Sequence, residues 1–375
     1  MKILFFIHNS APGGAEKAVS NFIRHAAGTE IKMALAFRRA PIIDAPANVE
    51  TVVRPARPRL SETLKYSIRK QWSSVPPNER FILAAHYKIR PDVWYVNTVM
   101  QPDVIKWAKR ERIPCILHTH ELAHMLHSLN KEEMSECVNY PSLILASSQA
   151  AKDVFSTLGR ERDIEVCYPP LNPAEIKTDA QAAQRLRASL GIPDETFIWL
   201  MAGSLDPNKN PVRLVQIAQE MLRAGLNAHF IWLGWGESGY SSYTQAYAKN
   251  LGVSEKISWL MVPKYDYYDC LNAADGFVLT SSHESFSIVS AEAAYLGKPI
   301  VAFDCGGVAE IVKPRMGIVI KSWNNSDLIT AMAAIMSGQT DFDPAVSRTR
   351  VREFFIEAQG ERWLRIVRKY FAKGV

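Results

Sequence analysis

The chain has 375 residues, 47% of them hydrophobic and 22% charged, a globular composition whose length favours two domains. No apolar run reaches the roughly 18 residues that a membrane-spanning helix needs, which argues against an integral membrane protein with helical spans. The net charge of +6 comes mostly from residues 1–175, which carry 23 Lys and Arg against 18 Asp and Glu.

The cysteines and the first residues bear on the cellular compartment. The chain contains five cysteines, an odd number with no C-x-x-C pair, so we expect reduced thiols. Residues 1–8 lead into Asn9 and Ser10 without the pattern of a signal-peptide cleavage site. We therefore expect a cytoplasmic protein, with peripheral binding at the inner face of the membrane as an open option.

The first half of the chain has the pattern of a parallel sheet covered by helices. Residues 3–7 form an apolar run, followed by a glycine loop and a helix over about 15–25. Short apolar runs follow at 93–96, 115–117 and 143–145. Strands that are apolar on both faces are typical of parallel sheets with helices on each side.

Residues 54–90 are rich in basic side chains. The nine basic residues are Arg54, Arg57, Arg59, Lys65, Arg69, Lys70, Arg80, Lys88 and Arg90. Two interpretations fit these residues equally well. One is a solvated helix face, and the other is a surface that binds anionic lipid headgroups or a phosphorylated acceptor. Nucleic acid is not the expected partner, because no aromatic stacking pattern accompanies the charges.

One stretch of the first half matches a zinc motif. His120, Glu121, Leu122, Ala123 and His124 fit H-E-x-x-H, in which two imidazoles one helical turn apart bind zinc. Zinc hydrolases carry this pattern within a helix, whereas here a strand and a loop lead up to His120. This context weakens the motif, so a zinc hydrolase is kept only as an alternative. A second alternative is that His120 is a buried histidine with a structural role.

A proline-rich linker divides the chain. Residues 168–173 contain three prolines, which can continue neither a helix nor a strand. We predict a domain over 1–170, a second over 171–348 and a C-terminal helix over 349–375 that returns to the first. Apolar strands of the second domain are predicted at 197–201, 230–233, 257–260, 276–280 and 300–303.

A glycine pattern follows the second strand of this domain. Gly234, Trp235, Gly236, Glu237, Ser238 and Gly239 fit G-x-G-x-x-G, which occurs in dinucleotide sites. No clear apolar helix follows it, so a short turn beside a nucleotide base, with Gly234, Gly236 and Met261, is the better interpretation.

The most informative stretch is 284–292. It joins an apolar strand to a helix, the place where open α/β sheets hold anions on unpaired N–H groups. A diphosphate suits the amides of Ser287, Ile288 and Val289. Carboxylates do not favour phosphate, so Glu284 and Glu292 suit hydroxyls of a ribose or sugar. Phosphate and hydroxyls together indicate a sugar nucleotide.

The E-x7-E pattern with Phe286 inside it resembles the donor site of glycosyltransferase family 4, retaining enzymes of the GT-B fold. The segments 12–16, 118–121, 203–209 and 304–310 resemble further family landmarks in the right order. The resemblance implies an α/β protein with two Rossmann-like, doubly wound domains facing a central cleft. It also implies metal-independent transfer of a hexose from a nucleotide diphosphate to a glycan or lipid-linked acceptor, as in polysaccharide biosynthesis, with no cofactor.

The resemblance implies roles for single residues. His120, Glu284 and Lys209 would be catalytic, with Lys209 on the phosphates, Glu284 on the sugar and Glu292 on the ribose. The donor would be bound by Gly13, Gly14, Gly203, Ser204, Lys209, Glu284, Phe286, Ser287, Ile288, Val289 and Glu292. The chain departs from the family at Ser204, where an arginine is usual, and at Ser287, where glycine is frequent.

Three alternatives remain open. The first is a sugar-nucleotide hydrolase or epimerase of the same fold, which would need no acceptor hydroxyl. The second is a binding protein with a decayed site, suggested by Ser204. The third is the zinc hydrolase at His120 and His124.

Overall fold

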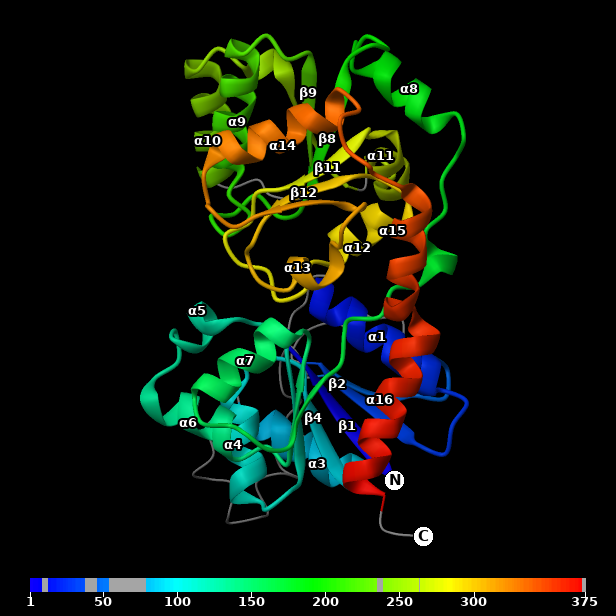
Figure 1. Ribbon diagram of the computed structural model, residues 1–375. Coiled ribbons are helices and arrows are strands. Elements are labelled where there is room, and N and C mark those ends of the chain that lie inside the picture. The colour runs from blue at the N-terminus through cyan, green and yellow to red at the C-terminus, as the bar shows by residue number, and fades with distance from the viewer. Residues whose placement is uncertain (9–12, 38–45, 54–78, 235–238, 263, 373–375) are drawn as a thin grey trace, which may run out of the picture. The chain divides into compact units, whose positions relative to one another are not determined.

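The computed structural model describes all residues except 9–12, 38–45, 54–78, 235–238, 263 and 373–375 (Figure 1). Most of the predicted basic surface, and Gly236 of the predicted base turn, lie outside the described residues. The chain forms two compact units, one comprising Met1–Leu171 with Phe354–Val375 and the other Asn172–Glu353. The sequence placed the boundaries after residues 170 and 348.

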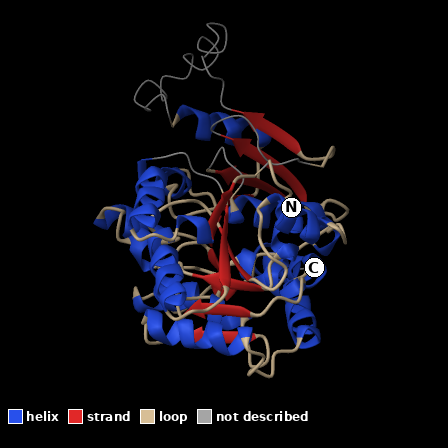
Figure 2. Cartoon of the chain, turned by 90° about the horizontal axis from the view of Figure 1, so that it is seen from above, coloured by secondary structure: helices blue, strands red, loops and turns tan. Residues whose placement is uncertain are grey.

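The first unit is built on a parallel sheet with the order β3-β2-β1-β4-β5-β6-β7. Its strands are β1 (Lys2–Ile7), β2 (Lys32–Phe37), β3 (Glu50–Val53), β4 (Val93–Val96), β5 (Cys115–Thr119), β6 (Leu143–Ala146) and β7 (Ile164–Val166). All residues of β4, β5 and β6 are buried, as expected of strands covered on both faces. Figure 2 shows the strands in red between blue helices.

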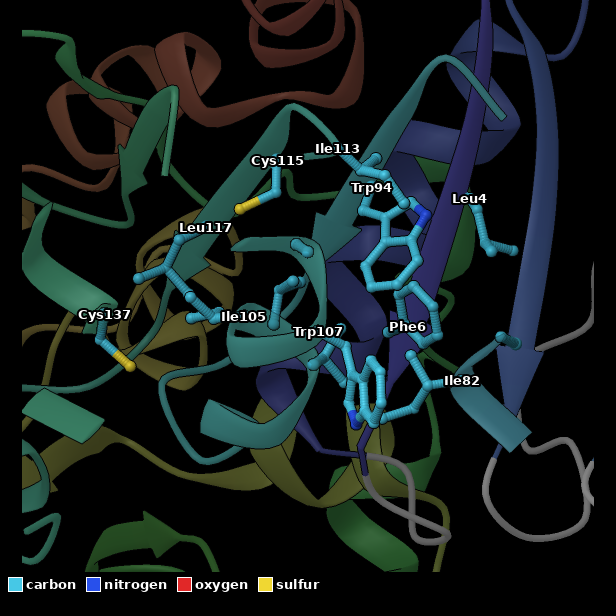
Figure 3. Close-up of a cluster of buried hydrophobic side chains, with 14 of the residues drawn as sticks. Leu4, Phe6, Ile82, Trp94, Ile105, Trp107, Ile113, Cys115, Leu117 and Cys137 are labelled. Atoms are coloured by element: carbon cyan, nitrogen blue, oxygen red, sulfur yellow. The ribbon is translucent and has the colours of Figure 1, made fainter. Parts of the chain in front are cut away.

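Helices cover both faces of this sheet. They are α1 (Gly14–Ala26), α3 (Arg80–Ile89), α4 (Pro102–Arg110), α5 (Ala123–Leu126), α6 (Lys131–Asn139), α7 (Gln149–Thr157) and α16 (Ile356–Phe371). On one face, Phe6 packs against Trp94 with ring centroids 4.9 Å apart, beside Trp107 from α4 (Figure 3). The buried side chains fix the ends of β4 and β5, which carry Asn97 and His120.

The C-terminal helix α16 packs against α1 on the opposite face of the same sheet. Trp363 is fully buried, with its ring stacked 6.3 Å from Phe5 and 5.8 Å from Phe22. The predicted continuous helix from residue 349 is wrong. Helix α15 (Pro344–Arg350) ends in the second unit, and α16 begins only at Ile356, because the chain passes between the units there.

The second unit has a parallel sheet with the order β10-β9-β8-β11-β12-β13. Its strands are β8 (Phe197–Ala202), β9 (Ala228–Leu233), β10 (Ile257–Leu260), β11 (Gly276–Leu279), β12 (Ile300–Phe303) and β13 (Gly317–Ile320). Its further helices are α8 (Ala182–Ser189), α9 (Pro211–Arg223), α10 (Gly239–Asn250), α11 (Tyr267–Ala273), α12 (Ile288–Tyr295), α13 (Val308–Ile311) and α14 (Asn325–Met336). Helices α9 and α14 contact each other, and α12 contacts α13 and α15.

Two expectations from composition are met in the described residues. The five cysteines are all buried and unpaired, which confirms the expected thiols. No described helix combines the length and the hydropathy needed to cross a bilayer.

Candidate functional site

The predicted donor residues of the second unit lie on loops at one edge of its sheet. Strands β8, β11 and β12 are neighbours, so the loops after their carboxyl ends lie together. The Thr280 hydroxyl donates to the carbonyl of Lys209 at 2.9 Å, and the Ser282 N–H donates to the carbonyl of Asn208 at 2.7 Å. On the other side, the Glu284 N–H donates to the carbonyl of Cys305 at 2.9 Å. The three loops form one hydrogen-bonded surface.

Lys209 and Glu284, predicted as separate ligands of phosphate and sugar, form an ion pair. Lys209 Nζ lies 2.6 Å from Glu284 Oε1, and the Ser281 hydroxyl donates to the same oxygen at 2.6 Å. The exposed fractions of the two side chains are 21% and 9%. A carboxylate this buried needs its cation. The pair places a positive and a negative group side by side at the strand end.

Two glycines allow the loops after β8 and β9 to approach each other. A Cβ on Gly234 would lie 1.8 Å from the Gly203 carbonyl oxygen, which also accepts from Trp232 Nε1 at 3.0 Å. Gly203 has φ +155° and packs against the aliphatic part of Lys209. The Gly234 N–H donates to the carbonyl of Leu260, next to the exposed Met261. Gly203, Gly234 and Met261 therefore lie along one edge.

Helix α12 begins directly after residues 280–287, here called the glutamate loop because they contain Glu284. Ser287 is its N-cap and has left-handed backbone angles, φ 75° and ψ 72°. Phe286 is buried beneath the loop. The N–H groups of Ile288 and Val289 open the helix, and no described residue accepts from them. The left-handed angle explains why glycine suits this position, a constraint that the sequence alone did not reveal.

We expect Ser287→Gly to be more stable than Ser287→Ala by about 1 kcal/mol, because only glycine adopts the left-handed region without a Cβ penalty. Both changes remove the hydroxyl that lies 2.8 Å from Ser290 Oγ, so the comparison isolates the backbone. Urea unfolding of the two variants measures the difference. At the exposed Ser326, in α14, the order should reverse, with alanine the more stable. Equal stability at residue 287 would contradict the backbone argument.

Glu292 lies on α12 and is 1% exposed. The hydroxyls of Tyr267 and Tyr268, from α11, donate to its two oxygens at 2.8 and 3.1 Å. Burial and the Glu292 charge raise the pKa of the Tyr267 hydroxyl well above its usual value. Sequence reasoning missed both tyrosines, because their only signal was a Tyr-Tyr pair beside the Asp266 helix cap.

Ser204, at the family's arginine position, is exposed and donates its hydroxyl to Asp206. Arg213 does not take the arginine's place beside it. Its guanidinium lies over the rings of Phe303 and Trp323, 4.6 and 5.4 Å from their centroids. Burial lowers the pKa of Arg213. Among the described residues of this unit, Lys209 is the cation paired with a carboxylate of the three-loop surface.

In the first unit, His120 follows β5 directly and precedes α5. Its Nε2 lies 3.0 Å from Asn97 Oδ1, at the end of the neighbouring strand β4. The Glu121 carboxylate accepts from the His120 N–H at 2.9 Å and from the Thr98 hydroxyl. Burial lowers the pKa of His120 to about 3. Sequence reasoning missed Asn97, which belongs to no recognisable motif.

The H-E-x-x-H stretch does not have the geometry of a zinc site. His120 lies in the loop and His124 in α5, so the histidines are not on successive turns of one helix. The described residues contain no group of three or more His, Cys, Asp and Glu placed to hold a metal ion.

The predicted glycine loop of this unit is described in part. Gly13 is the N-cap of α1, and Gly14 is the first residue of the helix. Both are exposed. A Cβ on Gly13 would lie 2.8 Å from Glu16 Oε2. The predicted loop residue Pro12 lies outside the described residues.

The match to a protein-family model lies within the second unit. Residues 183–352 match the family model Glycosyl transferases group 1. A D-inositol 3-phosphate glycosyltransferase of Nocardia farcinica is 26% identical over 255 residues, 62% of this chain and 56% of that protein. The match thus spans about half the length of this curated relative.

Two solved structures resemble the whole chain. Anabaena HepE in complex with UDP and glucose has a TM-score of 0.80 and 21% identity, covering 98% of this chain and 100% of that one. Sucrose-phosphate synthase from Thermosynechococcus elongatus has a TM-score of 0.80 and 17% identity, covering 99% of each chain. These likenesses and the two parallel sheets confirm the predicted fold class of two Rossmann-like domains.

Proposed function

From the match of residues 183–352 to the group 1 glycosyl transferases, we propose that the protein is a retaining enzyme that transfers a sugar from a nucleotide diphosphate to an acceptor hydroxyl. One observation supports this most: Lys209 and Glu284 lie paired beside the start of α12, whose first amides have no described acceptor. Cation and amides suit a diphosphate, and carboxylate suits sugar hydroxyls.

In the proposed reaction the bond between the sugar's anomeric carbon and the diphosphate oxygen breaks, and a bond to the acceptor oxygen forms on the same face. The acceptor proton passes to the departing phosphate oxygen. Lys209 then stabilises the negative charge that grows on the diphosphate. Glu284, released from the ion pair, accepts hydrogen bonds from the sugar.

The test is a thermal-shift screen of the full chain against nucleotide sugars. UDP-glucose comes first, because HepE was solved in complex with UDP-glucose. A ligand at a hundred times its dissociation constant stabilises a protein by about 2.7 kcal/mol. We expect a clear shift with at least one nucleotide sugar, and no shift with any of them would refute the proposal. Free sugar released without an acceptor would instead indicate a hydrolase.

We propose that the reaction needs no metal and that the acceptor is a glycan or a lipid-linked sugar. Transfer in the presence of a strong chelator supports the first part. For the zinc alternative, His120→Ala and His124→Ala would both remove one equivalent of zinc per chain and abolish activity. Peripheral binding at the cytoplasmic face of the membrane is tested by measuring how much protein binds to vesicles with and without anionic lipid.

We expect Glu292→Gln to weaken binding of the nucleotide diphosphate by about 1–3 kcal/mol, since a charged acceptor for ribose hydroxyls is lost. Titration calorimetry with the bare nucleotide measures this. Tyr267→Phe should weaken binding less, because it leaves the carboxylate in place and removes only one of its two tyrosine donors. Unchanged affinity in Glu292→Gln would remove this residue from the ribose.

A further inference from the structure

The ends of β4 and β5 carry a ladder of polar side chains in the first unit. These parallel strands pair Tyr95 with Ile116 and Val96 with Leu117. The Tyr95 hydroxyl lies 2.7 Å from His118 Nδ1, and one step further Asn97 Oδ1 lies 3.0 Å from His120 Nε2. The two imidazole rings are 4.1 Å apart between centroids. The Asn97–His120 pair is the outer step of this ladder.

The orientation of the Asn97 amide is fixed by a second contact. Its Nδ2 donates to the carbonyl oxygen of Ala15, in the first turn of α1, at 3.2 Å. A flipped amide would put two oxygens against each other there, so Oδ1 must face His120. An amide oxygen only accepts hydrogen bonds. His120 therefore has to carry its proton on Nε2.

The backbone of His120 is also held. Glu121 Oε2 accepts from the His120 N–H at 2.9 Å, and Glu121 Oε1 accepts from the Thr98 hydroxyl, one residue past Asn97. The carboxylate thus ties the two strand ends together. Because burial lowers the pKa of His120 to about 3, the ring is neutral near pH 7, with one N–H, and is not an imidazolium acid.

We propose that Asn97 is a positioning residue that holds His120 as the neutral Nε2–H tautomer, so that Nδ1 is presented as a hydrogen-bond acceptor for a substrate hydroxyl. No described residue donates to Nδ1. The substrate part of the inference rests on the proposed function. The tautomer itself does not.

The test is a two-bond proton–nitrogen spectrum of the full chain labelled with ¹⁵N-histidine near pH 7. Unprotonated and protonated ring nitrogens resonate far apart, and His120→Gln identifies the signal among the nine histidines. We expect Nε2–H in the wild type and in Asn97→Asp, which keeps an acceptor. Asn97→Leu should shift the population toward Nδ1–H. A wild-type ring protonated on Nδ1, or an unchanged tautomer in Asn97→Leu, would overturn the inference.

Gln101→Met is the matched control. Gln101 lies on the loop that follows β4, and its side-chain amide also donates to a backbone carbonyl, that of Phe6, at 3.1 Å. Its loss should leave the His120 spectrum unchanged, whereas a change would mean that the tautomer reports general loosening.

Rates of transfer then separate the two proposals. Asn97→Leu should lower kcat roughly five- to tenfold, the effect of one lost hydrogen bond, and Asn97→Asp should recover part of it. Normal transfer in Asn97→Leu despite a changed tautomer would overturn the acceptor role of Nδ1. A wild type with the expected tautomer but no transfer to any acceptor would refute the proposed function and leave the Asn97 inference standing.

Discussion

Replacing Lys209 with alanine is expected to lower kcat of sugar transfer by about 10²–10³, the usual effect of removing a group that stabilises charge developing in a transition state. Lys209 Nζ is the cation nearest the glutamate loop in the described part of the second unit, and Ser204 supplies no second charge there. Binding of the bare nucleotide should weaken as well. Steady-state kinetics and calorimetry measure the two effects.

The same change breaks an ion pair, so stability has to be separated from chemistry. Glu284 is 8% exposed, and leaving it without Lys209 should cost about 3–5 kcal/mol of folding stability. The double variant Lys209→Ala with Glu284→Gln removes the uncompensated charge. It should recover much of the stability. Because Glu284 is itself a proposed sugar ligand, the rate of the double variant is compared with that of Glu284→Gln alone, and kcat should stay about 10²-fold or more below it. A double variant as fast as Glu284→Gln would show that Lys209 acts only on the fold.

Lys298→Ala is the matched control for this experiment. Lys298 is also a partly buried lysine of the second unit, but its Nζ donates to the carbonyl of Asn272 at 2.6 Å, and the residue precedes β12, at the opposite edge of the sheet. Its loss should reduce stability with little effect on kcat. A comparable fall in kcat would mean that any lost lysine of this unit impairs the reaction.

Gly307→Ala is expected to destabilise the second unit by about 3 kcal/mol or more and to displace the glutamate loop. A Cβ on Gly307 would lie 2.0 Å from the Ser285 carbonyl oxygen and 2.8 Å from Phe286 Cα, and both are backbone atoms that no rotamer change can move. The Gly307 N–H also donates to the carbonyl of Glu284 at 2.9 Å, so the clash moves the glutamate itself. Urea unfolding and nucleotide calorimetry measure both losses.

Gly28→Ala is the control, because a Cβ there meets nothing within 4 Å and its backbone needs no positive φ. It should change stability by less than about 0.5 kcal/mol. A Gly307→Ala variant as stable as Gly28→Ala, with unchanged nucleotide binding, would refute the close approach between the two loops.

The alternation of apolar runs with helix signals predicted parallel sheets covered by helices, whereas the two Rossmann-like domains were implied by the family resemblance. Strands that are buried on both faces leave a long apolar run in the sequence, and β1, β4, β8 and β9 each appear as one. The break between α15 and α16 could not be predicted, because the amphipathic pattern continues through 349–372. What interrupts the helix is the passage of the chain from one unit to the other, a tertiary event.

The candidate site was predictable only where chemistry is local in sequence. The Glu284 to Glu292 spacing was visible, and its roles in donor binding remain predictions. The partners of these residues were not visible, because they come from other elements: Tyr267 for Glu292, Lys209 for Glu284 and Asn97 for His120. A hydrogen bond between two strand ends leaves no periodic signal in the sequence.

The return of α16 to the first unit has a consequence for synthesis on the ribosome. Trp363, Leu364 and Val367 complete the core to which Phe5 and Phe22 belong, so this unit cannot close until α16 has been made. The unit over 172–353 is continuous and can fold as soon as it emerges. Until α16 packs against it, the apolar surface of α1 is uncovered. Residues 1–171 are therefore synthesised before residues 172–353 but complete their core after them.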